Sequence, residues 1–432
     1  MARSSLDSTR LGRPFGVSLM VVLLTACAGS SVHLQSFDAV WHTVNNEFYD
    51  PGFNGIDWRA AYERYRAKLI AEDSEDGFYQ HANEMLFELN RSHLLAMRRS
   101  DVKRGMPHVF GTGTVGLDLR LVNGEAVVTR IEPGGPAARA GVRLGDKVRQ
   151  IDELTVAEIS REAQAFLIPP FNERNRINRV TNEILSHVYG APETNVYLHV
   201  QSAMGILRAL ALRRVSRGPG RIYVEALPPF YLEFEARSVG PGIGYIRLNH
   251  FIEPLGERFV QQMKRWSDLK GLVIDLRGTP GGYFTVADKI AEGLLRQRRS
   301  FASYRLRART ADRMLTPAED SFGGPVVILI DRLSLSTAEY FAGGMQAIGR
   351  ATIVGERSPG YLLGARWERL PNGGSFMVAF VDPVMSDGTV VENRGVIPDV
   401  EIARDPLQLA AGRDNQLEAA VDALKASPPR KD

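Results

Sequence analysis

Residues 325–341, PVVILIDRLSLSTAEYF, combine a continuous apolar run, a short loop with two serines and the start of a helical pattern. A run that is apolar at every position is typical of a strand buried on both faces, as in a parallel sheet covered by helices. The same kind of strand is expected upstream at GLVIDL (271–276) and downstream at ATIVG (351–355). Helical patterns alternate with these strands at residues 259–269, 287–295 and 337–348. This alternation predicts an α/β layered domain over residues 220–410.

The stretch before this domain is rich in β signals. VGLDLRLVNGEAVVTRI (115–131) contains two strand-like runs around Asn123-Gly124, which is a strong hairpin signal. EPGGPAARAGVRLGDKVRQID (132–152) follows with a Gly-Pro turn, a short helix start and another strand. The turn residues of these two stretches resemble the core of a PDZ domain, and residues 196–200 would supply its final strand.

The mature chain is expected to open with a helical domain. Phe37, Val40, Trp41, Val44 and Phe48 follow the spacing of one helical face. Two further segments repeat this spacing before residue 90. Together they predict three helices that bury their apolar faces against one another.

The extreme N-terminus has the features of a targeting segment. Basic residues precede an apolar run at 17–24, which is too short to span a bilayer as a stable helix. The run ends in Leu24-Thr25-Ala26-Cys27, which resembles a bacterial lipobox, and Cys27 is the single cysteine of the chain. The resemblance implies acylation of Cys27 and removal of residues 1–26. A plain secretory signal with an incidental cysteine is the alternative.

The predicted organisation is therefore a multidomain α+β chain. Its segments are a lipoprotein signal peptide (1–26), a helical domain (31–105), a PDZ domain (106–215) with an apparent insertion at about 155–193, the α/β domain (220–410) and a C-terminal tail (411–432). The net charge of the 432 residues is +3 and no long run of like charges occurs, which argues against nucleic acid as a partner.

Four separated motifs carry a family resemblance. They are KGLVIDLRGTPGG (270–282), DRLSLSTAEYF (331–341), GRATIVGE (349–356) and VENRGVIPDVEI (391–402). This ordered set resembles the S41 serine peptidases, which include the C-terminal processing (tail-specific) proteases and tricorn protease. The resemblance implies a catalytic domain of the layered ClpP/crotonase-like kind and hydrolysis of peptide bonds.

The same resemblance implies a nucleophile and an oxyanion site. In the family the nucleophilic serine lies three residues before the glutamate that opens the following helix, which here makes Glu339 the glutamate and Ser336 the nucleophile. Ser334 is the neighbour that could be confused with it, and an ordinary helix N-cap is the structural alternative. The backbone amides of Gly281, Gly282 and Thr337 would form the oxyanion site. Thr279 departs from the asparagine that is common in this loop.

The general base is predicted to be a histidine. One branch of the family uses a lysine, but its position matches Tyr361, and no lysine lies between Lys289 and Lys425. The tricorn-like branch instead uses a Ser-His pair before the PDZ domain and a glutamate near the end of the catalytic domain. Its pattern matches Ser92-His93 and Glu392, so His93 is the expected base, with Ser92 and Glu392 holding the imidazole. His250 is the alternative base.

The remaining expectations concern binding partners, cofactors and cellular location. The PDZ turn at Val115, Gly116 and Leu117 is predicted to bind substrate polypeptides through their C-termini. No metal or nucleotide motif is present, so no cofactor is indicated. Lipidation at Cys27 would tether the protein to the periplasmic face of the outer membrane. A catalytically inactive binding or scaffold protein on the same fold is the alternative function.

Overall fold

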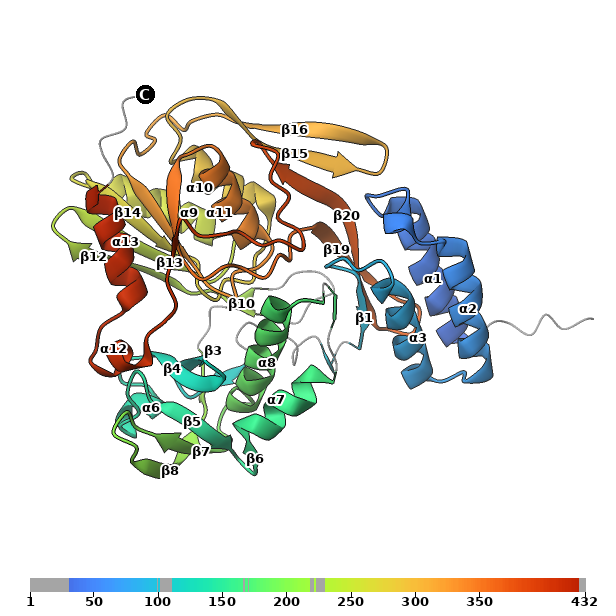
Figure 1. Ribbon diagram of the computed structural model, residues 1–432, viewed down its shortest axis with the longest axis horizontal. Coiled ribbons are helices and arrows are strands. Elements are labelled where there is room, and N and C mark those ends of the chain that lie inside the picture. Colours follow the sequence, from blue (N-terminus) through green and yellow to red (C-terminus); the bar gives the residue numbers. More distant parts are fainter. Residues whose placement is uncertain are drawn as a thin grey trace, which may run out of the picture.

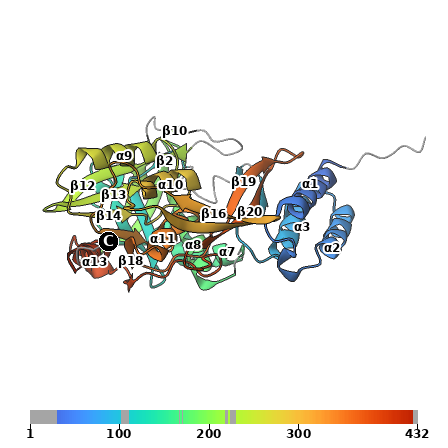
Figure 2. The same ribbon diagram turned by 90° about the horizontal axis from the view of Figure 1, so that it is seen from above.

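The computed structural model describes residues 31–98, 100–101, 111–165, 168–169, 171–217, 221–222 and 230–426. Figure 1 shows a helical lobe at one end, an α/β part in the middle and a β-rich part below it. Seen from above, the helical lobe stands at the far end of the long axis (Figure 2). The predicted multidomain α+β architecture is confirmed.

A six-stranded sheet forms the centre of the α/β part. Its strands, in spatial order, are β12 (Phe234–Gly240), β13 (Ile243–Leu248), β14 (Gly271–Asp275), β17 (Val326–Ile330), β18 (Ala351–Gly355) and β21 (Val400–Glu401). β12 is antiparallel to β13, and the following pairs are parallel. The buried strands expected from the sequence are thus β14, β17 and β18.

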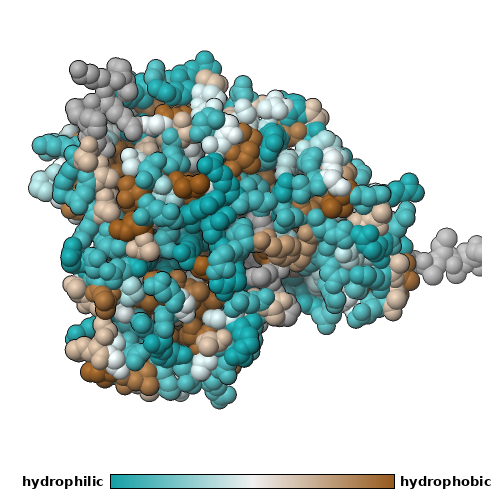
Figure 3. Space-filling model, in the orientation of Figure 1, coloured by the Kyte–Doolittle hydropathy of each residue, from teal (hydrophilic) through white to brown (hydrophobic). Residues whose placement is uncertain are grey.

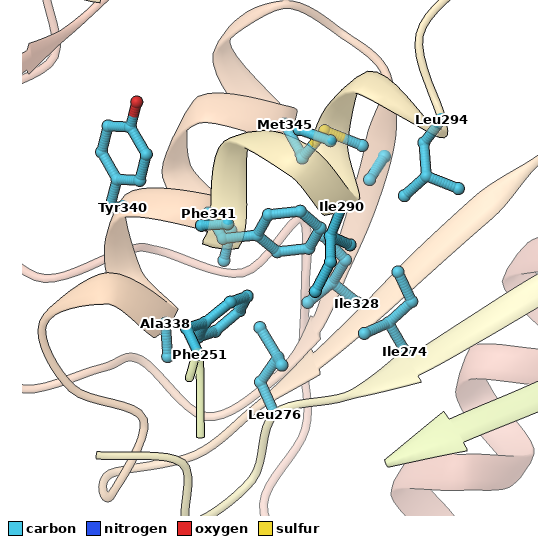
Figure 4. Close-up of a cluster of buried hydrophobic side chains, with 14 of the residues drawn as sticks. Phe251, Ile274, Leu276, Ile290, Leu294, Ile328, Ala338, Tyr340, Phe341 and Met345 are labelled. Atoms are coloured by element: carbon cyan, nitrogen blue, oxygen red, sulfur yellow. The ribbon is translucent and has the colours of Figure 1, made fainter. Parts of the chain in front are cut away.

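Helices cover both faces of this sheet. One layer contains α9 (Leu255–Arg265), α10 (Phe284–Glu292) and α11 (Thr337–Ala347), and the other contains α13 (Asn415–Ala426). Because side chains alternate along a strand, Ile274 and Ile328 pack into the first layer, while Val327 packs against α13. Figure 4 shows the first layer, where Phe341 of α11 lies among side chains from α10 and the sheet.

A second sheet joins the helical lobe to the α/β part. It contains β1 (Leu95–Met97), β20 (Ser375–Met385), β15 (Arg299–Leu306), β16 (Arg309–Leu315) and β19 (Gly364–Arg369). The lobe consists of α1 (Val32–Glu47), α2 (Trp58–Ala71) and α3 (Glu75–Phe87), whose buried side chains share one core with Phe376 and Val378 of β20. Because Leu95 pairs with Met377, the residues just before β1 are held close to β20 and the α/β part.

The β-rich part has its own sheet and core. The strands, in spatial order, are β3 (Leu117–Val122), β4 (Glu125–Ile131), β5 (Lys147–Ile151), β7 (Asn195–Gln201) and β8 (Leu207–Arg213), and β6 (Leu154–Thr155) pairs with β5. The predicted hairpin between β3 and β4 is present. Asn123 and Gly124 have φ values of 51° and 80°, as a tight two-residue turn requires.

The described residues of the segment at 155–193 pack into this domain. It forms α7 (Val156–Gln164) and α8 (Glu173–Val188). Ile159, Ile184 and Leu185 are buried in the same core as the sheet. The sequence shows helical character at 177–187, but it does not reveal what this helix packs against, because α8 is largely polar and faces both the sheet of this domain and the α/β part.

The remaining elements are short. They are η1 (Phe53–Gly55), β2 (Gly113–Thr114), α6 (Pro136–Arg139), β9 (Val215–Ser216), β10 (Arg221–Ile222), β11 (Phe230–Tyr231) and α12 (Pro406–Ala410). Within the described ranges, no helix has the length and apolar character needed to cross a bilayer. Met204, Ile206 and Leu207 are exposed around the turn between β7 and β8, where Figure 3 shows apolar side chains at the lower edge of the molecule.

Candidate active site

Ser336 stands at the turn between β17 and α11. Its φ is 53° and its ψ is −116°, a conformation that L-residues rarely adopt. Such a strand–turn–helix geometry points a serine hydroxyl away from the sheet. Ser334 differs, because it is fully buried and its hydroxyl donates to the Leu276 carbonyl at 2.8 Å. Of the two serines, Ser336 therefore has the hydroxyl that faces a histidine.

A chain of three hydrogen bonds runs from Ser336 into the protein. The Oγ of Ser336 lies 3.2 Å from Nε2 of His93, and Nδ1 of His93 lies 2.7 Å from the Oγ of Ser92. The Ser92 hydroxyl in turn donates to Oε2 of Glu392 at 2.8 Å. These residues come from the loop after α3, the start of α11 and the loop after β20, so the fold brings together the four side chains that the sequence singled out.

Hydrogen bonds from backbone amides fix the carboxylate at the end of this chain. Oε1 of Glu392 accepts from the Ser92 amide at 2.8 Å, and Oε2 accepts from the Leu362 amide at 2.8 Å. Nevertheless, burial raises the pKa of the Glu392 carboxyl to about 8. Burial also lowers the pKa of His93 to about 4, so its imidazole is neutral at pH 7. A neutral imidazole is the form that can accept a proton from a serine.

The predicted oxyanion amides lie beside Ser336. A Cβ on Gly281 would come within 2.8 Å of the Ser336 Cβ and 3.0 Å of the Thr337 amide nitrogen, so the two loops are in close contact. Gly281 has a φ of 110°, which only glycine adopts without strain. In the part of the chain that the structure describes, the amides of Gly281, Gly282 and Thr337 have no hydrogen-bond acceptor. Three donors are thus available near one hydroxyl.

A second buried carboxylate shapes the nucleophile loop. Glu339 accepts hydrogen bonds from the Ser358 hydroxyl at 2.6 Å and from the amides of Gly360, Tyr361 and Ser336 at 2.7, 2.8 and 3.1 Å. Burial raises the pKa of Glu339 to about 7. The sequence marked Glu339 only as a landmark for the serine. Its role as the residue that ties 358–361 to the nucleophile was not anticipated, since it depends on contacts between separate loops.

Tyr361, which stands at the lysine position of the other branch, closes one side of the site. Its ring centroid lies 5.9 Å from that of His93, and its carbonyl accepts from the Ser336 amide at 3.0 Å. Its hydroxyl donates to the Pro169 carbonyl, in the loop between α7 and α8, at 2.6 Å. The position is therefore filled by an aromatic side chain that contacts the PDZ domain.

The other predicted residues lie elsewhere. His250, the alternative base, is buried just after β13, whereas His93 is the histidine at hydrogen-bond distance from Ser336. In the PDZ turn, Val115 and Leu117 are buried and the Gly116 amide donates to Thr114 Oγ1 at 2.9 Å. That amide is thus already engaged, and peptide binding at this turn stays a prediction. Cys27 lies outside the described residues.

No metal centre was found in the described ranges, since no group of three or more His, Cys, Asp or Glu side chains is placed to hold an ion. The groups that meet at the site are a hydroxyl, an imidazole, a carboxyl group and backbone amides. These are the parts that acyl transfer requires.

Comparison with known proteins identifies three segments of the chain. Residues 242–402 match the model of peptidase family S41, residues 33–87 match the tricorn protease C1 domain and residues 127–177 match the PDZ domain. Together the three matches span more than half of the chain and each falls in a different part of the fold.

Individual relatives agree with this assignment. The chain is 27% identical to a putative tricorn protease homolog 2 of Streptomyces coelicolor over 91% of its own length, but it spans only 33% of that relative. It is 24% identical to a carboxyl-terminal-processing protease of Picosynechococcus, with 89% of this chain and 87% of the relative covered. The photosystem II D1 C-terminal processing protease shares the fold, with a TM-score of 0.54 at 22% identity over 87% of this chain and 94% of that one. Residues 242–402 therefore form a peptidase family S41 domain, and the chain is a serine-type peptidase with a PDZ domain, similar to the C-terminal processing and tricorn proteases.

Proposed function

We propose that the chain is a serine endopeptidase that works by a tricorn-like Ser/His/Glu mechanism. Ser336 is the nucleophile and His93 is the general base. Ser92 and Glu392 hold the imidazole and stabilise its protonated form. The continuous chain of hydrogen bonds from Ser336 Oγ to the Glu392 carboxyl is the observation that carries this proposal.

The reaction follows from this arrangement. Nε2 of His93 takes the hydroxyl proton as Ser336 Oγ attacks the peptide carbonyl, and the amides of Gly281, Gly282 and Thr337 bind the resulting oxyanion. Collapse of the intermediate breaks the C–N bond, and His93 returns the proton to the leaving amine. Water, with its proton taken by His93, then hydrolyses the acyl-enzyme and restores the Ser336 hydroxyl.

The proposed substrates are polypeptides outside the cytoplasm, recruited in part through their C-termini. The PDZ domain and the similarity to a carboxyl-terminal-processing protease support C-terminal recognition. The lipobox-like Leu24-Thr25-Ala26-Cys27 supports an anchor on the periplasmic face of the outer membrane.

Covalent labelling tests the assignment of the nucleophile and base. We expect a fluorophosphonate to add once to the wild-type chain, at Ser336, and not to add to Ser336→Ala. Ser334→Ala should label like the wild type if it folds, and His93→Ala should label at least ~10³-fold more slowly, because the hydroxyl loses its base. Labelling of Ser336→Ala at the wild-type rate would refute the assignment. An inert, folded wild-type chain would instead favour the binding or scaffold alternative.

A further inference from the structure

The hairpin of β7 and β8 presents apolar side chains to solvent. Met204, at its turn, is 81% exposed, and Ile206, just after the turn, is 55% exposed. Because side chains alternate along a strand, Ala209 lies on the same outer face of β8 as Leu207, and both are exposed. We call Met204, Ile206, Leu207 and Ala209 the hairpin patch. Figure 3 shows apolar side chains gathered at this edge of the molecule.

The hairpin patch lies at a free edge of the PDZ sheet. β8 is the last strand in the order of that sheet, and its outer edge has no strand beside it in the described part of the chain. The turn at 203–206 is exposed at every position and joins the two strands at one end of the sheet. Contiguous exposed apolar side chains of this kind are typical of a contact with another molecule or with a membrane.

The hairpin has no negative charge near its turn. No aspartate or glutamate occurs between Glu193 and Glu225, although the chain has 50 acidic residues among 432. Glu193 pairs with Arg213 at the opposite end of the hairpin from the turn. Asp152 lies near that end as well, where it accepts from the Tyr197 amide at 2.9 Å. The end that carries the hairpin patch would therefore not repel an anionic surface.

Two exposed arginines lie beside the hairpin. Nη2 of Arg208, on β8, donates to the Gly141 carbonyl at 3.1 Å, so the segment around Gly141 is next to this strand. Arg139 and Arg143, on either side of Gly141, are exposed and form no ion pair within the described ranges. Asp146, in the same segment, is buried and pairs with Arg208 at 3.2 Å. The exposed charge of this segment next to the hairpin patch is thus positive.

The N-terminal end of the chain limits how far the molecule can lie from a membrane. Cys27 precedes Ser31, the N-cap of α1, by four positions, and a segment of that length reaches at most about 14 Å. With Cys27 acylated, as proposed above, the helical lobe would be held at the bilayer. The hairpin is far from this lobe along the long axis (Figure 1). A second contact at the hairpin would lay the molecule along the surface.

We propose that the hairpin patch, with Arg139 and Arg143 beside it, docks on the anionic surface of a phospholipid bilayer. The side chains of Met204, Ile206 and Leu207 enter the boundary between headgroups and acyl chains, and the guanidinium groups contact lipid phosphates. The most exposed side chain lies at the turn, away from the β8 edge that a protein strand would pair with, which favours a lipid surface. The contact goes beyond the proposed peptidase function and needs neither turnover nor the lipid anchor.

Vesicle binding by the chain that starts after Cys27 tests this contact without the anchor. The chain is sedimented with phosphatidylethanolamine vesicles that contain about a quarter phosphatidylglycerol, and with vesicles of phosphatidylcholine alone. We expect binding to the anionic vesicles and at least about tenfold weaker binding to the neutral ones. Ile206→Ser should weaken binding to the anionic vesicles about fivefold, because an apolar side chain that enters the bilayer is lost.

A matched control lies on the helical lobe. Ile70, on α2, is also 55% exposed, so Ile70→Ser should bind vesicles like the wild type. The double variant Arg139→Gln/Arg143→Gln should lose affinity for the anionic vesicles only. Every variant should hydrolyse a short soluble peptide like the wild type, so the outcome of the peptidase test and that of the vesicle test are independent.

Two results would overturn the proposal. One is equal binding of the wild type, Ile206→Ser and Ile70→Ser to the anionic vesicles, or no binding by the wild type. The other is self-association of the chain that Ile206→Ser abolishes, without binding to vesicles, which would identify a second copy of the chain as the occupant of the hairpin patch.

Discussion

At the residue scale, the direction of the hydrogen bonds that link Glu392, Ser92 and His93 decides whether His93 can act as a base. If Glu392 is ionised, the Ser92 hydroxyl donates to it, Nδ1 of His93 donates to Ser92, and Nε2 is free to accept from Ser336. If Glu392 is protonated, it can donate to Ser92, which then donates to Nδ1 and leaves the proton on Nε2. In that tautomer Nε2 cannot accept from Ser336. The ionised carboxylate is therefore the form that supports catalysis.

The pH dependence of kcat/KM should report this carboxylate. Because burial raises the pKa of Glu392 to about 8, the active form accumulates as the pH rises through about 8. His93, with a pKa lowered to about 4, is already neutral throughout this range and adds no inflection near the ordinary histidine value of about 6.5. We expect kcat/KM to rise up to about pH 8 and then level off.

The matched variant for this profile is Glu392→Gln, which cannot ionise. Its activity should be lower and should no longer rise near pH 8. A profile that keeps the same inflection in the variant would show that another group titrates.

Residue types were more predictable than residue conformations. Ser336, His93 and Glu392 could be named because each stands in a short motif. The positive φ values of His93 (58°) and Ser336 (53°) could not be predicted, because they arise from the packing of distant loops around each residue. The network around Glu339 escaped prediction for the same reason.

At the element scale, one buried aspartate links the PDZ sheet to both catalytic loops. Asp331, at the end of β17, accepts from the amides of Gly278 and Leu333 at 2.9 Å each. It also accepts from Nε of Arg120, on strand β3 of the PDZ domain, at 2.8 Å. Although burial alone would raise it, Arg120 and Arg404 hold the pKa of Asp331 well below its usual range. The oxyanion loop, the nucleophile loop and the PDZ strand thus share one anchor.

Removal of Arg120 should weaken this anchor. We expect Arg120→Met to lower the free energy of unfolding by about 3 kcal/mol, because it leaves a buried carboxylate without its main partner. It should also reduce kcat, since the loops at Gly278 and Leu333 lose their common support. Denaturant unfolding and peptide turnover measure the two effects.

Arg130, on the neighbouring strand β4, provides the control. Its side chain is 43% exposed and pairs with Glu233, so Arg130→Met should change stability by less than about 1 kcal/mol. If Arg120→Met were as stable and active as Arg130→Met, the contact between Arg120 and Asp331 would not support either stability or activity.

Elements with strong local patterns were predicted well, and those that depend on neighbours were not. Strands β14, β17 and β18 are largely apolar and were expected. Helix α9 begins at Leu255, four residues before the predicted start, because Leu255 is buried under the sheet together with Phe259. Helix α8 was placed in an apparent insertion, because its polar sequence does not reveal that one face completes the PDZ core.

At the scale of the whole molecule, the active site is assembled from parts that are remote in sequence. His93 and Ser336 are separated by 243 positions, and Ser92 and Glu392 by 300. Strand β1 holds the Ser92-His93 pair against β20. Asn178 of α8 donates to the Arg332 carbonyl in the loop before Ser336, and Tyr361 donates to the Pro169 carbonyl in the loop before α8. The contacts between these distant residues could be predicted only from the family resemblance, since no local sequence pattern specifies which distant loops will touch.

Each of the three parts of the molecule contributes residues to the site or borders it. In the proposed mechanism the helical lobe supplies the base, the PDZ domain borders the loop before Ser336, and the α/β part supplies the nucleophile and the oxyanion amides (Figure 1). Near the C-terminus, Leu409 of α12 packs on Val122 and Val127 of the PDZ sheet, which adds a second connection between the PDZ domain and the rest. All three parts should therefore be needed for activity.

The central claim is that Ser336 cleaves peptide bonds with His93 as its base. The most direct test is hydrolysis of a mixed peptide library by the chain that starts after Cys27, with wild type, Ser336→Ala and His93→Ala compared by mass spectrometry. The account predicts turnover by the wild type and losses of at least ~10³-fold in both variants. Full activity of His93→Ala beside an inactive Ser336→Ala would contradict the assignment of the base, and full activity of Ser336→Ala would contradict the account as a whole.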